Sequence, residues 1–185
     1  MYERTTNQSC NSWHLTRGLL PEISNFDRAN RSNPNLICAD VENLAGGSDR
    51  VGEKQHELTL MLRTTMASTK DHLVWSAGPN ALENAPSMKT AWEARGWKYI
   101  EPFQGLSGPD KSLAFHLLTS PHVLHASHLI ILGGDGEFLE AVQFAIRKGT
   151  RVTVVGLWGD TAKSFRKTGA TVVELTGLYG LDKLL

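Results

Sequence analysis

Cysteine is scarce in this chain: Cys10 and Cys38 are the two cysteines among 185 residues, and they lie far apart in the sequence. Small secreted domains that depend on disulfides are much richer in cysteine, so the composition does not fit that class. Cys38 lies inside an apolar run, where a buried free thiol is expected. A reducing, cytoplasmic location fits this pattern.

Long apolar runs are also missing. No stretch approaches the roughly 18 consecutive apolar residues that a membrane-spanning helix needs. The chain begins with Glu3, Arg4 and further polar residues in place of the apolar core of a signal peptide. We therefore expect no membrane partner. Hydrophobic content of 41% and charged content of 21% are ordinary for a globular protein, and 185 residues suit one domain with a substantial core.

An excess of positive charge is the third absence, because 19 basic and 19 acidic side chains give a formal net charge of zero. Proteins that coat nucleic acid without specificity are usually more basic. One local stretch is basic, with six cations against the single acid Asp160: Arg147, Lys148, Arg151, Lys163, Arg166 and Lys167. Solvated helix ends are the first interpretation of this stretch, and a phosphate-binding face is the alternative.

The first 34 residues differ from the rest of the chain. They contain the polar, turn-rich segment NRSNPN at 30–35, and their few apolar residues do not recur at a helical or strand period. We interpret residues 1–34 as a largely disordered N-terminal arm and residues 35–185 as the folded domain.

After the arm, apolar strands alternate with helices. The strands are predicted at 36–41, 72–77, 97–101, 128–132, 151–157 and 171–175. The helices are predicted at 53–66, 87–96, 109–120, 136–148 and 161–168. Such alternation, with several continuously apolar strands, is typical of a parallel sheet covered on both faces. The predicted fold is α/β: a Rossmann-like three-layer α/β/α sandwich with a mostly parallel sheet of five to six strands.

Polar side chains follow the strands that should flank the centre of this sheet. If the strand order is 3-2-1-4-5, the first and fourth strands border the crevice where the order reverses, and ligands usually bind there. Residues from three distant segments then meet at one edge: Asp40, Glu42 and Asn43 after the first strand, Asp110 in the helix after the third, and Asp135 and Glu137 after the fourth.

Helix capping explains several of these acids taken singly. Asp135 can cap the helix that begins at Gly136, while Glu137 and Asp110 lie in first turns, where acids are favourable. Capping leaves Asp40 unexplained, since it ends an apolar strand, and Glu42 two residues later should point the same way. Carboxylates crowded into one crevice resist ionisation unless a cation neutralises them. The pattern therefore predicts a site for Mg²⁺ or Mn²⁺, which prefer oxygen ligands.

Three motifs carry a resemblance to a known family. DVENLAGG (40–47), GPDKSLAFHLL (108–118) and GGDGEF (133–138) resemble the NYN domain, a LabA-like branch of the PIN-like nuclease superfamily. The resemblance covers roughly residues 36–175. It implies a Rossmann-like sandwich, an RNA partner, and metal-dependent cleavage of RNA phosphodiester bonds, with room for a homo-oligomer or a protein partner.

The resemblance also implies roles for particular residues. Asp40, Asp110 and Asp135 would hold one or two Mg²⁺ or Mn²⁺ ions, and Glu137 would hold a second ion or orient the attacking water. Asn43 would donate a hydrogen bond to a phosphate or to Asp40. The family usually writes its last motif S-G-D-x-D-F, so this chain departs from it at Gly133 and Glu137.

Two other functions stay open on the sequence. The departures at Gly133 and Glu137 are compatible with a catalytically degenerate module that binds RNA or acts as a scaffold. GGDG after a strand also resembles the glycine-rich nucleotide loop of lipid and diacylglycerol kinases, although Glu137 would repel a triphosphate.

Histidines and one tryptophan complete the candidates. His116, His122, His125 and His128 lack a familiar zinc spacing and are interpreted as surface or loop residues. Trp158, just after the fifth strand, is expected in the core, with stacking on an RNA base as the alternative.

Overall fold

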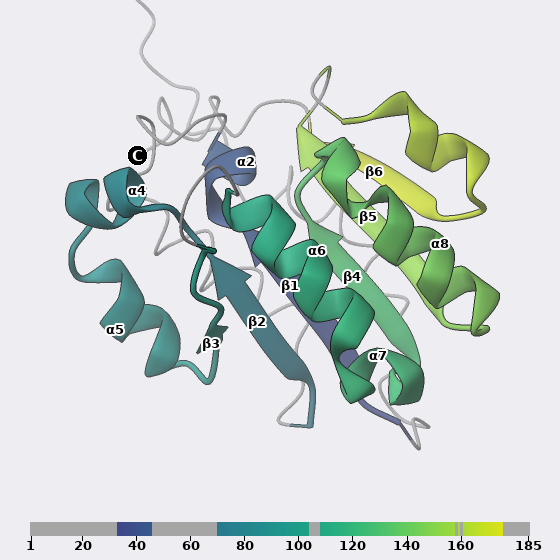
Figure 1. Ribbon diagram of the computed structural model, residues 1–185, viewed down its shortest axis with the longest axis horizontal. Coiled ribbons are helices and arrows are strands. Elements are labelled where there is room, and N and C mark those ends of the chain that lie inside the picture. Colours follow the sequence, from purple (N-terminus) through teal and green to yellow (C-terminus); the bar gives the residue numbers. More distant parts are fainter. Residues whose placement is uncertain (1–32, 46–69, 104–107, 158, 160, 176–185) are drawn as a thin grey trace, which may run out of the picture.

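The computed structural model describes residues 33–45, 70–103, 108–157, 159 and 161–175. Within these ranges six strands form one sheet, in which all neighbours are parallel and the order is β3-β2-β1-β4-β5-β6 (Figure 1). The strands are β1 (Asn35–Asp40), β2 (His72–Ser76), β3 (Lys98–Tyr99), β4 (His128–Leu132), β5 (Arg151–Leu157) and β6 (Thr171–Leu175). The predicted α/β fold and the predicted order of the first five strands are confirmed.

Helices and single turns connect these strands. The α-helices are α2 (Val41–Ala45), α4 (Pro79–Asn84), α5 (Met88–Glu93), α6 (Pro109–Thr119), α7 (Pro121–His125) and α8 (Leu139–Arg147). Two 3-10 helices, η2 (Gly136–Phe138) and η3 (Lys163–Lys167), precede α8 and β6. Among the helices of these ranges, none has the length and apolar character needed to cross a bilayer.

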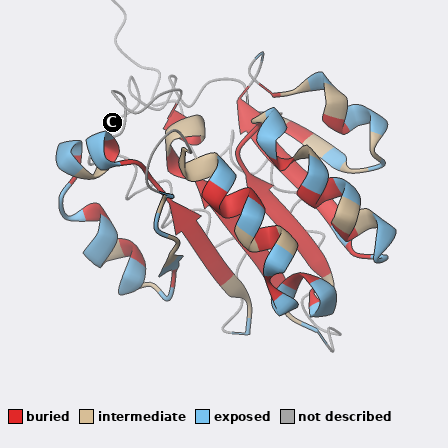
Figure 2. Cartoon of the chain, in the orientation of Figure 1, coloured by how far each residue is buried: buried red, intermediate tan, exposed pale blue. Residues whose placement is uncertain are grey.

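The central strands are buried along their whole length, as Figure 2 shows. Ile37 of β1 pairs with Leu73 of β2 on one side and with Ile130 of β4 on the other. Neighbouring residues of a strand face opposite sides of the sheet, so an unbroken apolar run supplies both faces at once. This is why the short apolar segments of the sequence form interior strands.

Each face of the sheet has its own core. On one face, Cys38 and Ile131 pack with Leu113 and Leu117 of α6 and Val142 of α8. Figure 1 shows α6 and α8 running side by side over this face. On the opposite face, apolar residues of the strands pack with α2, α4 and α5: Ile37, Trp75, Ile130, Val41, Leu44, Ala81, Met88 and Trp92.

A cluster of aromatic rings joins α5 to strands β2 and β3. The Trp75 ring lies 4.7 Å from Trp92 and 4.9 Å from Tyr99, measured between ring centroids, and Trp92 lies 4.9 Å from Trp97. All three tryptophans are buried. Tilted rings at these separations contribute attraction beyond the area that they bury, which anchors α5 beside the two-residue strand β3.

Several element boundaries differ from the prediction. The chain turns into α2 directly after Asp40, so Glu42 is helical and the expectation that Asp40 and Glu42 share one face of a strand was wrong. Helices α4 and α7 were not predicted; each has proline in its first turn, where a missing N–H costs nothing. The helix predicted at 136–148 begins with a 3-10 turn, and the helix predicted at 161–168 is a 3-10 helix. The arm at 1–32, the helix at 53–66 and Trp158 lie outside the described residues.

Candidate functional site at the carboxyl edge of the sheet

Asp40 lies at the point where the strand order reverses. It ends β1, pairs in register with Ser76 of β2, and is only 4% exposed. Its Oδ1 accepts a hydrogen bond of 3.2 Å from the backbone N–H of Asn43, so Asp40 caps α2. The expectation that capping leaves Asp40 unexplained was therefore wrong, because the strand runs straight into a helix with no residue between them.

The electrostatic environment of Asp40 is unfavourable to its charged form. Its pKa is raised from 3.8 to about 7, chiefly by burial and additionally by the nearby carboxylates of Asp110, Glu42 and Asp135, while the Asn43 amide acts in the opposite direction. A capping carboxylate is normally stabilised as an anion, yet no cation in the described part of the chain lowers the pKa of this one. Asp110 and Asp135, the other two predicted metal-binding aspartates, are close enough to Asp40 to act on it electrostatically.

Glu42 has a structural partner. Its Oε1 accepts a 2.7 Å hydrogen bond from the backbone N–H of Gly78, which precedes α4. The carboxylate thereby links α2 to the segment after β2. It still lies near enough to raise the pKa of Asp40.

Asn43 also binds within the protein. Its side-chain Oδ1 accepts a 2.6 Å hydrogen bond from the backbone N–H of Gly134, which holds α2 against the glycine-rich segment. The interaction with Asp40 comes from the Asn43 backbone, not from its side chain. Asn43 is therefore a positioning residue in this structure, and it makes the expected donation to Asp40 through its backbone N–H.

Asp135 and Glu137 begin the helical segment after β4. Asp135 Oδ1 accepts a 3.0 Å hydrogen bond from the Glu137 N–H, which confirms the capping role predicted for Asp135. Asp135 is half-buried and Glu137 is exposed. Glu137 is not one of the three carboxylates that raise the pKa of Asp40.

Asp110 reaches the same edge from α6. It is half-buried in the first turn, and its Oδ1 folds back over Gly108, within 2.5 Å of where a β-carbon on that glycine would lie. The residue before the helix makes no side-chain capping hydrogen bond. Unlike the carboxylates of Asp40, Glu42 and Asp135, the Asp110 carboxylate accepts no backbone hydrogen bond within the described residues, so Asp110→Asn should disturb the local backbone little.

The carboxylate oxygens at this edge are suitable ligands for a hard divalent cation, but their arrangement is less suitable. In the described ranges, no group of three or more His, Cys, Asp or Glu side chains is arranged to hold a metal ion. Mg²⁺ does not require such a group, because it keeps several waters and is commonly held by one or two carboxylates. Asp40 with either Asp110 or Asp135 would meet that requirement.

Gly133 explains one departure from the family motif. Its φ of +151° is one that residues with a side chain rarely adopt, and an added β-carbon would lie 3.1 Å from the Asp40 β-carbon. A serine at this position would strain the backbone and press on the candidate site. The backbone conformation of Gly133 and the nearness of the Asp40 β-carbon together disfavour a side chain at this position.

The glycine-rich segment does not form an open phosphate cradle. The N–H of Gly133 donates to the Val155 carbonyl at 2.7 Å, and the N–H of Gly134 is bound by Asn43. Free backbone amides are what a nucleotide-binding loop offers to phosphates. Two amides of GGDG are already engaged, which argues against the kinase alternative.

Sequence reasoning missed how the loop after β5 supports this segment. Thr161 packs so closely on Gly134 and Gly156 that a β-carbon on either glycine would collide with it. Ala162 N–H also donates to the Gly134 carbonyl at 2.8 Å. A signal was available, since an isolated glycine within a strand, here Gly156 in β5, indicates close approach by another backbone.

The basic residues at 147–167 and His128 make contacts or lie at positions that structural roles explain. Arg166 of η3 pairs with Glu174 at 2.7 Å, and Arg147 and Lys148 are exposed at the end of α8, as solvated helix ends would be. His128 is buried, with Nε2 2.9 Å from Thr153 Oγ1, so its assignment to the surface was wrong. It belongs to the interior pairing of β4 with β5.

Comparison with known proteins supports the fold alone. The sequence matches no protein-family profile and no curated protein. The crystal structure of VPA0982 from Vibrio parahaemolyticus, described as a protein of unknown function, matches with a TM-score of 0.51 and 14% identity. The match covers 80% of this chain and 96% of that chain.

Proposed function

We propose that this chain is a ribonuclease of the NYN and PIN-like type, which hydrolyses RNA phosphodiester bonds with the help of Mg²⁺ or Mn²⁺. One observation carries the proposal. A buried carboxylate, Asp40, lies at the switch point of the sheet with a pKa raised to about 7 by burial and by three neighbouring carboxylates. A bound cation would relieve that excess of negative charge.

The proposed roles follow from where each residue lies. Asp40 and one of Asp110 and Asp135 would hold the ion, which when bound polarises a phosphate oxygen and lowers the pKa of a bound water. Glu137, exposed beside Asp135, would orient the attacking water or bind a second ion. Asn43 would act indirectly, by keeping α2 and the glycine-rich segment in contact.

A binding module without catalysis is the second candidate, and specific contacts favour it. The carboxylate of Glu42, the side chain of Asn43 and the carboxylate of Asp135 all make structural hydrogen bonds. Such a protein would use the same edge to bind RNA and would not cleave it.

The proposed setting is cytoplasmic, where RNA is abundant. Cys38 is a buried free cysteine, as expected in a reducing compartment. A homo-oligomer or a protein partner would enlarge the RNA-binding surface beyond this edge.

Cleavage of a mixture of single-stranded and structured RNA tests the proposal. The full chain is assayed with Mn²⁺ and with EDTA, alongside Asp110→Asn, Asp135→Asn and the control Glu93→Gln, an exposed acid on α5. We expect EDTA to abolish cleavage, and Asp110→Asn or Asp135→Asn, whichever removes the second ligand, to lower its rate by about 10- to 100-fold. The control should cleave like the wild type.

Two results contradict the ribonuclease proposal. If all variants bind RNA equally and none cleaves it, the binding module is the better description. If cleavage survives EDTA, or is unchanged in both Asp110→Asn and Asp135→Asn, the activity comes from another site or from a contaminant. Circular dichroism of each variant shows whether the fold is retained.

A further inference from the structure

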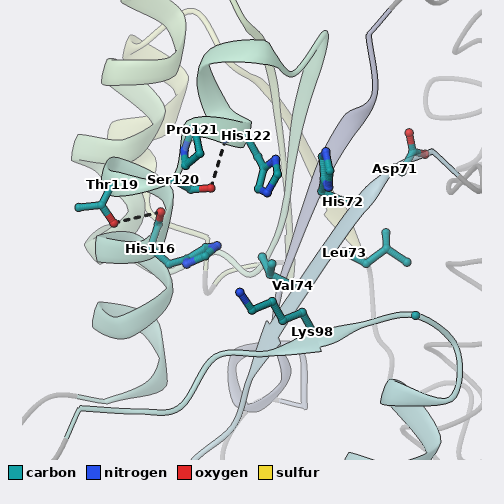
Figure 3. A pocket seen from close by; sticks show the side chains of 11 residues that line it. Asp71, His72, Leu73, Val74, Lys98, His116, Thr119, Ser120, Pro121 and His122 are labelled. Carbon is teal, nitrogen blue, oxygen red and sulfur yellow. Dashed lines mark hydrogen bonds between the residues drawn. The ribbon is translucent and has the colours of Figure 1, made fainter.

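A second candidate site lies at the opposite edge of the sheet. A pocket of about 420 Å³ opens where β2 and β3 begin and where α6 ends (Figure 3). His72 at the start of β2, Lys98 at the start of β3, His116 of α6 and His122 of α7 line it. Because β2 runs from His72 to Ser76, which pairs with Asp40, the pocket is separated from the carboxylates by the length of the strand.

The pocket gathers groups that can carry positive charge. Its lining includes three imidazoles and one ammonium group, against the single acid Asp71. The Asp71 carboxylate is bound by Asn35, whose backbone N–H and side-chain amide donate to it at 2.9 and 3.2 Å. Asp71 therefore already serves to hold the start of β1. Figure 3 shows His72 and His122 across the hollow from Lys98.

One imidazole nitrogen is left without a partner. His116 Nε2 is buried and makes no hydrogen bond within the described part of the chain. Leaving a buried nitrogen unpaired costs free energy that a ligand oxygen would recover. Figure 3 shows the His116 ring on the wall of the pocket, beside Lys98 and Val74.

The histidine geometry argues against a metal ion. His72 and His122 stack with their ring centroids 3.8 Å apart and an interplanar angle of 29°. The lone pairs of stacked rings lie nearly parallel in the ring planes, so they do not converge on one ion. This agrees with the lack of a metal-holding group among the residues that the structure describes.

Burial and nearby cationic groups both lower the pKa of His116 and of His122. Burial lowers the pKa of His116, and Lys98 and His122 lower it further. Burial likewise lowers the pKa of His122, with His72, Lys98 and His125 adding to the effect. A negative ligand would reverse these effects, and the histidines would take up protons as it binds.

We propose that this pocket binds a small ligand through a phosphate monoester group. A phosphate dianion offers three oxygens to donors that come from four separate elements, whereas a carboxylate offers two. Its second pKa, near 6, lies in the range where histidines titrate, so ligand and pocket can share protons. The volume lies within the range of small-molecule sites, which leaves room for the rest of the ligand.

Calorimetric titration of the full chain with inorganic phosphate tests this proposal. We expect saturable binding that is tighter at about pH 6 than at about pH 8, because the bound state holds more protons. Imidazole NMR signals of His116 and His122 should titrate at higher pH when phosphate is present. A phosphate monoester should compete with inorganic phosphate, and dimethyl phosphate, a singly charged diester like the RNA backbone, should not.

Substitutions locate the binding. Lys98→Gln and His116→Gln should each weaken phosphate binding by about ten-fold, since each removes a charge-assisted hydrogen bond. Lys167→Gln, an exposed cation on η3, is the matched control and should bind like the wild type. Lys98 is exposed, so its variant should keep the fold. Absence of saturable binding, equal binding by Lys98→Gln and wild type, or equal competition by dimethyl phosphate would overturn the proposal.

Discussion

Asp40 closes strand β1 and caps helix α2, so one side chain lies where the chain changes from one element to the next. Asp40 therefore contributes both to the fold and to the candidate site. Its carboxylate is needed by the Asn43 amide, yet burial and three acids disfavour its charge. Asn at this position would keep the cap and remove the charge, which separates the two effects.

The titration of Asp40 predicts how stability depends on pH. Its pKa is 3.8 in the ordinary state and about 7 in the fold, so its favourable contribution is complete below about pH 4 and is lost as pH rises through 7. In Asp40→Asn this loss should disappear. One pKa unit corresponds to about 1.4 kcal/mol, so above pH 7 the free energy of unfolding of the variant should exceed that of the wild type by up to about 4 kcal/mol.

Urea unfolding of both proteins at about pH 4 and about pH 8 measures the difference. At the lower pH the two stabilities should be similar, because the wild-type carboxyl is then protonated and resembles the amide. Equal stabilities at the higher pH as well would show that Asp40 is not held in an unfavourable charged state.

At the scale of elements, the link between β4 and η2 is the most constrained connection of the site. Gly133 brings the backbone against Asp40 of β1, Asn43 of α2 and Phe138 of η2. Gly133→Ser, which introduces the serine of the NYN motif that the sequence resembles, should therefore lower the free energy of unfolding by about 1–3 kcal/mol, the usual cost of a disfavoured backbone conformation.

Thermal unfolding of Gly133→Ser measures this cost, with Gly136→Ala as the matched control. A β-carbon on Gly136 would meet only the Ala162 β-carbon, at 3.8 Å, which is ordinary contact. We expect the control to change stability by much less. A serine variant as stable as the wild type would mean that the backbone at 133 is free to relax.

The strands and their order could be predicted because burial on both faces requires continuous apolar runs, as in HLIIL at 128–132. Helix α2 could not, since five residues carry too little periodic pattern to mark a helix. The edge at which the acids gather also followed from parallel topology. The hydrogen bonds of Glu42 and Asn43 could not be predicted from the sequence. They form because β1 ends at Asp40, one residue before the end of the strand predicted at 36–41.

For the whole molecule, ligand binding at the carboxyl edge should appear as a change in global stability. A cation that binds the folded state and not the unfolded state raises the melting temperature, and it must displace the proton from Asp40. Mn²⁺ should therefore raise the melting temperature of the wild type above about pH 7 and much less at about pH 5. A shift that is the same at both pH values, or that survives in Asp40→Asn, would place the ion elsewhere.

The aromatic cluster beside β2 gives the protein an internal optical probe. Trp75, Trp92 and Trp97 are shielded from water, with neighbouring ring centroids 4.7 and 4.9 Å apart, near enough to exchange excitation energy. Loosening of β2 from α5 would wet all three indoles together and move their emission to longer wavelengths. Strand β2 has His72 at one end and Ser76, paired with Asp40, at the other. Once the emission of Trp13 and Trp158 is subtracted, intrinsic fluorescence reports, without any added label, on the strand that spans the distance between the two candidate sites.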